Sequence, residues 1–210
     1  MTGIFSNFLK LKPEKRERIL NAAMKEFAQK GYKTASTDEI VKEAEISKGA
    51  LFHYFNNKKG LFLYLYDYVI DVLLNEMIVK FDYEEKDFFA RLRQGSMLKL
   101  EILKKYPEMY NFVLAAYTEE SGEVKGELKN SYNDVIEKSQ CFLYEGVDFT
   151  KFKDGIEIKR AIEIIIWAME GFSNKELAKI KKLSLNEETY IELLNEADIY
   201  LEMLKDMFYQ

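Results

Sequence analysis

The chain of 210 residues is long enough for one or two domains of roughly 150 residues and can bury a sizeable core. Hydrophobic residues make up 48% and charged residues 32%, which is typical of a globular protein and excludes a disordered one. Two Pro and ten Gly are too few for the frequent turns of an all-β protein, and one His with one Cys cannot supply a usual zinc site.

The net charge of −5 is unevenly distributed along the chain. Residues 1–60 carry 12 Lys and Arg against 7 Asp and Glu, a net +5, so residues 61–210 carry −10. A basic segment on an acidic body suits a DNA-binding module, because the positive end meets phosphate while the negative bulk stays away. We therefore expect a DNA-binding domain at 1–60 and a second domain at 61–210.

No segment has the pattern of a signal peptide or a membrane span. The apolar stretch at the start ends at Lys10, and no run of about 20 apolar residues follows. The lone Cys141 permits no intrachain disulfide and serves either as a small buried residue or as a redox sensor. We expect a cytoplasmic protein without a membrane partner.

The first strong helical pattern covers residues 13–30. It opens with a proline, a favoured first helical residue, and Ile19, Ala23 and Phe27 recur at a spacing of four. Gly31 follows as a C-terminal stop. The pattern predicts an amphipathic helix that ends at this glycine.

Two short helices are expected next. Ser36 and Glu39 have the spacing of a capping box, and Ser47 can cap a second helix over 48–54 after a tight turn. A helix pair of this kind, between two longer helices, is a helix-turn-helix setting in which the second helix enters the major groove. Leu51 and Phe55 of that helix should face the core. The residues expected to remain outward are Lys48, Gly49, Ala50, His53 and Tyr54.

The remaining chain is helical throughout, which makes the fold all-α with about nine helices. Asn56 or Asn57 can cap the next long helix. We expect helices over 57–80, 84–105, 107–117, 123–145, 156–180 and 187–208, with a loop over 146–155.

Residues 14–65 resemble the TetR family of transcriptional regulators. The resemblance rests on Ile19–Ala23, Phe27, Lys30–Tyr32, Thr37–Ile40, Ala44, Ile46–Phe55 and Lys58–Leu61. It implies an N-terminal three-helix DNA-binding head and a larger helical body that binds a small ligand and dimerises through its last two long helices. It places six residues at operator contacts: Thr37, Lys48, Ala50, His53, Tyr54 and Lys58. Gly49, on the expected helix over 48–54, is also assigned to the DNA-binding surface.

Two positions depart from the family pattern. Glu45 stands where the family commonly has Gly, which costs on the order of 1 kcal/mol if the turn needs a positive φ. Phe52 replaces a common Tyr, so one phosphate-contacting hydroxyl is missing. Both departures affect the contacts and leave the expected fold unchanged.

The helix over 156–180 is apolar on nearly all sides, so it must be covered on most of them. We expect it to pack, together with 187–208, against the same helices of a second copy. The homodimer would then place two recognition helices about 34–36 Å apart, one turn of DNA.

The body is rich in aromatic residues and Met, which suits an apolar or aromatic effector or, alternatively, plain core packing. Trp167 either lines the pocket or fills the core, and Glu163 and Glu170 either face the ligand or lie on the surface. The expected lining is Phe89, Met97, Tyr110, Leu114, Tyr117, Phe142, Trp167 and Met169.

The expected function is a sequence-specific DNA-binding regulator, a repressor released from double-stranded operator DNA by its ligand. No nucleophile–base pair, metal constellation or cofactor motif is found, so we expect no catalytic residues and no enzyme. His53 has no partner spaced to make it a catalytic base or metal ligand, and Lys58 with Lys59 is either a solvated pair or a phosphate contact. The alternative is a helical small-molecule- or lipid-binding or scaffold protein without regulatory DNA binding.

Overall fold

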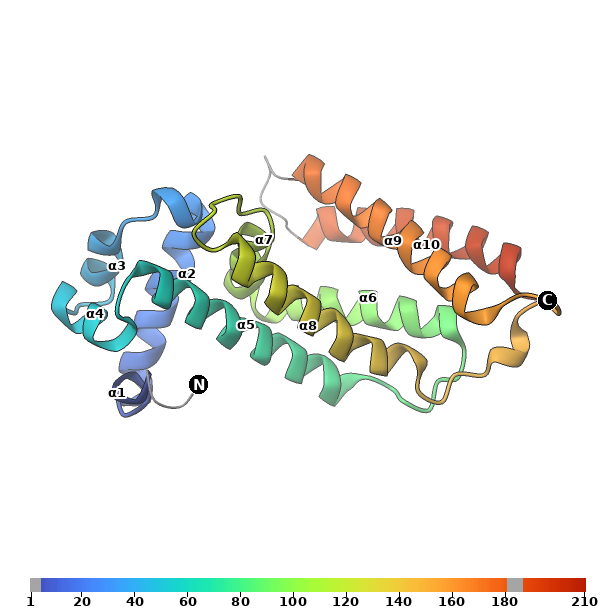
Figure 1. Ribbon diagram of the computed structural model, residues 1–210, viewed down its shortest axis with the longest axis horizontal. Coiled ribbons are helices and arrows are strands. Elements are labelled where there is room, and N and C mark those ends of the chain that lie inside the picture. Colours follow the sequence, from blue (N-terminus) through green and yellow to red (C-terminus); the bar gives the residue numbers. More distant parts are fainter. Residues whose placement is uncertain (1–4, 181–186) are drawn as a thin grey trace. The chain divides into compact units, whose positions relative to one another are not determined.

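The computed structural model describes residues 5–180 and 187–210, apart from the side chains of residues 132, 136–142 and 177–180. This part of the chain is helical, with one isolated β-bridge between Phe152 and Tyr209, and confirms the all-α expectation (Figure 1). The helices are α1 (Ser6–Leu9), α2 (Pro13–Thr34), α3 (Thr37–Glu43), α4 (Lys48–Phe55), α5 (Lys58–Lys80), α6 (Phe88–Lys105), α7 (Pro107–Tyr117), α8 (Lys125–Tyr144), the 3₁₀ helix η1 (Phe149–Lys151), α9 (Ile158–Ile180) and α10 (Glu187–Phe208).

The predicted helices are all present, and the structure adds two short ones. Helix α1 has four residues and η1 has three, which is too short for an amphipathic repeat to develop. Asn57, not Asn56, caps α5, because its Oδ1 accepts the Gly60 N–H at 2.8 Å. No helix in the described ranges is long and apolar enough to cross a membrane.

The chain divides into two compact units. One consists of Met1–Glu76 and Tyr106–Glu137, and the other of Met77–Lys105 and Lys138–Gln210. The first unit extends past residue 60. The domain boundary at residue 60, which we inferred from the distribution of charged residues, therefore stays a prediction.

The apolar stripe of α2 forms the centre of the first unit. Ile19, Ala23 and Phe27 are fully buried, as the spacing predicted. The Phe27 ring meets Phe62 of α5 edge-on at 4.9 Å and lies 6.3 Å from Phe112 of α7. One hydrophobic core therefore joins the head helices to α5 and α7.

The end of α2 is kinked, and two carboxylates hold it in place. Gly31 has a φ of +68°, which interrupts the helix where the sequence predicted a stop, although one further turn follows to Thr34. The Tyr32 N–H donates to Glu119 Oε2 at 2.8 Å, and the Tyr32 hydroxyl donates to Glu123 Oε2 at 2.7 Å. A Cβ at Gly31 would lie 3.2 Å from the same Glu119 oxygen, so glycine suits both the kink and the contact.

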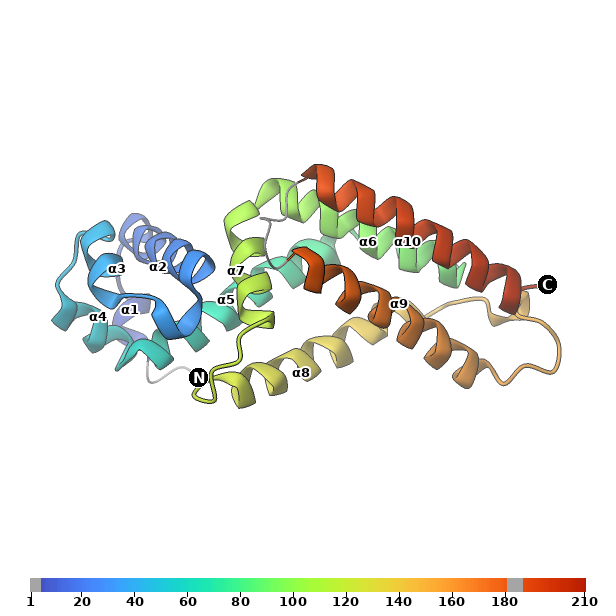
Figure 2. The same cartoon turned by 90° about the horizontal axis from the view of Figure 1, so that it is seen from above.

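In the second unit, α10 runs beside α6 and also contacts α9 (Figure 2). Its core contains Phe88, Phe89, Ile165 and Leu201, together with Tyr209 just after α10. The Phe89 and Tyr209 rings meet edge-on at 4.9 Å. Two ion pairs, Arg93–Asp198 and Lys104–Glu187, join the exposed sides of α6 and α10.

Arg91 is a fully buried cation in this unit. Its guanidinium donates to the carbonyl oxygens of Tyr83 at 2.9 Å and Glu85 at 2.6 Å, and to that of Glu145 after α8. The carbonyl oxygens compensate the positive charge of the buried guanidinium. Through these hydrogen bonds, Arg91 connects the segment before α6 to the residue after α8.

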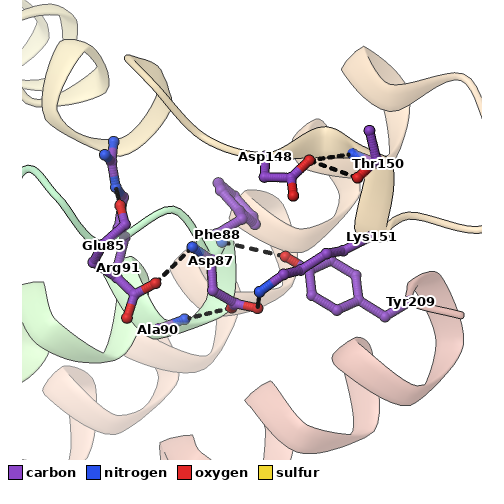
Figure 3. Close-up of polar contacts among 9 residues, drawn as sticks. All are labelled: Glu85, Asp87, Phe88, Ala90, Arg91, Asp148, Thr150, Lys151 and Tyr209. Carbon is purple, nitrogen blue, oxygen red and sulfur yellow. Dashed lines mark hydrogen bonds and ion pairs between the residues drawn. The ribbon is translucent and has the colours of Figure 1, made fainter.

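Figure 3 shows the start of α6 fastened to η1 and to the residue after α10. Asp87 accepts the Ala90 N–H at 3.0 Å and pairs with Lys151 at 2.9 Å. Burial opposes ionisation, but these two partners hold the pKa of the Asp87 carboxyl below its ordinary value. The Tyr209 hydroxyl accepts the Phe88 N–H at 3.2 Å, so α6 begins on contacts from distant segments.

Replacing Arg91 should unfold the second unit readily. Arg91→Ala removes three part-buried hydrogen bonds and leaves a cavity in place of a fully buried side chain, so we expect a loss of more than about 3 kcal/mol or a chain that does not fold. Urea unfolding followed by circular dichroism measures this. The control is Arg93→Ala on the same helix, whose exposed pair with Asp198 should contribute less than about 1 kcal/mol. Equal losses for both variants would contradict the role of Arg91.

Tyr32→Phe should destabilise the first unit in a pH-dependent way. Burial, and then the Glu123 carboxylate, raise the pKa of Tyr32 to about 12. The folded chain therefore keeps the phenolic proton between pH 10 and 12 while the unfolded chain loses it, so the hydroxyl's stabilisation is complete below pH 10 and declines above it. We expect a deficit of about 1–2 kcal/mol at pH 8 that narrows at pH 11.

Urea unfolding at both pH values measures the Tyr32→Phe deficit. Tyr83→Phe is the control for the loss of a tyrosine hydroxyl at the surface, because Tyr83 is 43% exposed, and we expect it to cost less than Tyr32→Phe at pH 8. A Tyr32→Phe deficit of the same size at pH 8 and pH 11 would show that the hydroxyl bond does not carry the effect.

Candidate nucleic-acid interface

The helix-turn-helix consists of α3, α4 and the turn between them. Ser36 Oγ accepts the Glu39 N–H at 3.4 Å, and Ser47 Oγ accepts the Ala50 N–H at 3.1 Å, so both predicted caps are present. The Ser36 N–H donates to Glu26 of α2 at 2.8 Å, where a full capping box would use Glu39. Helix α3 is thereby attached at its first turn to α2.

The turn bends at Glu45, which has a φ of +53°. The sequence departs here from a common glycine, and the turn does need the left-handed conformation. Arg18 of α2 holds it on both sides, with Nε donating to the Ala44 carbonyl at 2.8 Å and the guanidinium 3.1 Å from the Glu45 carboxylate. These contacts from a neighbouring helix offset part of the backbone strain.

Helix α4 buries one side and exposes the other. Leu51 and Phe55 are 1% and 0% exposed, as predicted. Lys48, Gly49 and His53 are exposed, and Ala50 is half-buried. The exposed side begins with small residues after a lysine, so a DNA backbone or base edge can approach it closely.

Tyr54 does not lie outward as the sequence predicted. It is only 9% exposed, and its ring lies 6.2 Å from Phe8 and 6.3 Å from Phe55. The reason is α1, whose Phe8 is buried against α4 and was not expected there. A phosphate contact by the Tyr54 hydroxyl stays a prediction, while the ring belongs to the core.

Lys48 is paired at the exposed surface with Asp38 of α3. Its Nζ lies 2.8 Å from Asp38 Oδ1 and 3.0 Å from Oδ2. Both side chains are about half-exposed or more, so the pair is weak and Lys48 can exchange Asp38 for another anion. Thr37, which precedes Asp38 in the first turn of α3, is half-buried.

Lys58 and Lys59 are used within the protein, which neither interpretation of the sequence foresaw. Lys58 Nζ donates to the carbonyl oxygens of Lys33 at 3.1 Å and Ala35 at 2.9 Å, and it lies over the Tyr32 ring. It thus neutralises the carbonyl end of α2. Lys59 pairs with Glu127. A phosphate contact by Lys58 stays a prediction.

One contact at this surface was missed in the sequence. Asn7 of α1 places its Nδ2 3.0 Å from Nε2 of His53. Both side chains are exposed, so Asn7 adjoins the residue predicted to face DNA. The only signal was the pair of aromatic residues Phe5 and Phe8, three apart, that bracket Asn7.

The predicted ligand-lining residues are divided between the two units. Tyr110, Leu114 and Tyr117 lie on α7 in the first unit, and only Tyr117, at 43%, is exposed. Phe89, Met97, Trp167 and Met169 lie on α6 and α9 in the second unit. The side chain of Phe142 lies outside the described part. Their role in a pocket stays a prediction, and Phe89 is used in the core with Tyr209.

Trp167 does not fill the core of the single chain, because it is 64% exposed. Ile164, one turn before it, is 46% exposed, and Glu170, one turn after it, is exposed. Glu163 is half-buried. On α10 four exposed apolar residues fall on a spacing of four, Ile191, Ile199, Met203 and Met207, with Asn195 at the intervening step, and Tyr200 is exposed next to them.

The described residues contain no group of three or more His, Cys, Asp or Glu that could hold a metal ion. Helix α3 exposes Asp38, Glu39, Lys42 and Glu43, whereas the exposed residues of α4 are Lys48, Gly49 and His53. The exposed residues of α4 can contact phosphates and base edges.

The family model for "Bacterial regulatory proteins, tetR family" matches residues 19–65, which span α2 to the first part of α5. An uncharacterized HTH-type transcriptional regulator of Bacillus subtilis, YuxN, is 31% identical over 156 residues, which cover 64% of this chain and 52% of the relative. The negative transcriptional regulator IcaR of the biofilm operon icaADBC in Staphylococcus aureus is 21% identical, over 86% of this chain and 97% of IcaR. The chain spans about half the length of the first two curated relatives it matches.

Solved structures share the fold over nearly the whole chain. A TetR family regulator from Chloroflexus aurantiacus covers 98% of this chain and 98% of its own, with a TM-score of 0.64 and 18% identity. A TetR transcription regulator from Haloarcula marismortui covers 95% and 100%, with a TM-score of 0.68 and 18% identity. Residues 19–65 therefore match the DNA-binding domain of the TetR family, and the chain as a whole has the fold of solved TetR family structures.

Proposed function

We propose that this protein is a sequence-specific DNA-binding transcriptional regulator, a repressor that a small apolar or aromatic ligand releases from its operator. The observation that carries this is a helix-turn-helix with both helices capped, whose second helix exposes Lys48, Gly49 and His53 within the basic segment. A binding role, not a catalytic one, agrees with the family. The name of IcaR as a negative regulator supports repression.

We propose that the protein acts as a homodimer through α9 and α10. Two exposed apolar stripes support this, Ile164 with Trp167 on α9 and Ile199 with Met203 and Met207 on α10. Exposing large apolar side chains to water on two neighbouring helices is unfavourable. The same helices of a second copy of the chain could bury them. Two heads then read half-sites about 34–36 Å apart.

Ligand release follows from this arrangement as an equilibrium coupling. Ligand and operator favour different separations of the two heads, and such couplings are typically about 1–3 kcal/mol. An apolar effector agrees with the name of one relative, the fatty acid metabolism regulator protein of Bacillus subtilis, which is 23% identical over 168 residues.

Operator binding should depend on Lys48. We expect Lys48→Ala combined with Tyr54→Phe to lower the affinity for DNA flanking the protein's own gene at least about tenfold and to reduce the salt slope by about 1. Tyr54→Phe is chosen because it removes the hydroxyl and keeps the buried ring. Gel shift and fluorescence anisotropy at several salt concentrations measure this.

Lys25→Ala is the matched control for Lys48. Lys25 also forms an exposed ion pair at 2.8 Å, with Glu43, but it lies on α2. Its loss should leave the affinity within about twofold. Unchanged binding by the Lys48 and Tyr54 variant, with folding intact, would show that α4 does not read the operator.

The dimer should depend on the α9 and α10 stripes. We expect Trp167→Glu with Met203→Glu to give a monomer, because two charges per chain would be buried unpaired at the interface. Size-exclusion chromatography with light scattering measures the mass. Val79→Glu, an 83% exposed apolar position on α5, should leave the dimer intact. A parent chain that is monomeric at micromolar concentration would refute the proposed interface.

A further inference from the structure

The four-residue helix α1 is attached directly to the recognition helix. Phe8 is 1% exposed, and its ring lies 4.8 Å from Phe55 and 5.4 Å from Tyr64. Phe5 lies 4.6 Å from the same Tyr64. These aromatic contacts on both sides of Asn7 hold its backbone against α4 and α5.

Asn7 lies within hydrogen-bonding distance of the His53 imidazole. Its Nδ2, a donor, lies 3.0 Å from His53 Nε2. A neutral imidazole has one donor and one acceptor nitrogen, and Nε2 can accept only if the proton is on Nδ1. With Nδ2 as the donor, the contact matches the Nδ1–H tautomer, in which Nε2 is the acceptor.

The Nδ1–H tautomer leaves a donor for DNA. Among the described residues, His53 makes no other hydrogen bond, and the side chain is exposed on the outward side of α4. The Nδ1–H group can therefore donate to guanine N7 or O6 or to a phosphate oxygen. With the other tautomer, Nδ1 would be an acceptor and would repel those same atoms.

We propose that Asn7 is a positioning residue for operator recognition: it holds His53 as the Nδ1–H tautomer so that the imidazole donates to an acceptor on the DNA. Helix α1 thereby belongs to the DNA-binding surface, outside the region that matches the family model, residues 19–65. This inference rests on the proposed DNA-binding function.

The tautomer can be measured without DNA. His53 is the single histidine, so a two-bond ¹H–¹⁵N spectrum of the tag-free, full-length chain contains one imidazole. At about pH 8.5, two units above the usual histidine range, we expect the spectrum of the parent chain to show a protonated Nδ1 and an unprotonated Nε2. Asn7→Ala should shift the population toward Nε2–H, and Asn7→Asp should shift it further, because a carboxylate can only accept.

The consequence for DNA is tested by a double-mutant cycle on the flanking DNA. We expect Asn7→Ala to lower operator affinity about three- to tenfold, and to have no further effect in a His53→Ala background. Affinity for unrelated DNA at low salt should be unchanged. Asn21→Ala is the matched control, since it removes an exposed asparagine of α2 that does not contact His53.

Two results would overturn the inference. Identical imidazole spectra for the parent chain and Asn7→Ala would show that Asn7 does not select the tautomer, and additive losses in the cycle would show that it does not act through His53. Failure of the proposed function looks different. In that case Lys48→Ala and His53→Ala would both leave DNA affinity unchanged, while the spectrum of the free chain would still report on Asn7.

Discussion

Burial of the apolar stripe of α2 is the constraint on which the DNA-binding unit depends. Phe27, in the middle of this stripe, contacts α5 and α7 as well as the end of its own helix. Near it, Arg18 of α2 bonds the turn after α3, and the buried Glu26 accepts the N–H of Ser36, the N-cap of α3. The orientation of α3 and α4 is therefore set from α2, by packing on one side and by hydrogen bonds on the other.

Several basic side chains of the head are bound by groups of the protein itself. Lys25 and Lys59 pair with carboxylates, and Lys58 binds backbone carbonyl oxygens. Lys48 is paired as well, but with an exposed Asp38 beside the recognition helix. Exchange of that partner for a phosphate costs little, because exposed ion pairs contribute at most about 1 kcal/mol. The net charge of a segment thus matters less for binding than the exposure of the individual pairs.

Local rules account for most of what was predicted correctly. Helix positions follow from apolar spacing, the caps at Ser36 and Ser47 follow from side-chain chemistry next to the first turn, and the break at Gly31 follows from the absence of a Cβ. Each of these depends on residues within a few positions along the chain. The recognition helix could therefore be located, and its buried side identified, before any tertiary contact was known.

By itself, then, the sequence determined an all-helical chain with a basic helix-turn-helix, since helix periodicity and capping are local properties. Only the tertiary structure decided which charges and rings are available at the surface. Tyr54 is covered by Phe8, and His53 is bonded by Asn7, 46 residues away. Trp167 is left exposed on α9. These outcomes depend on which distant segments meet, and no local pattern in the sequence encodes that.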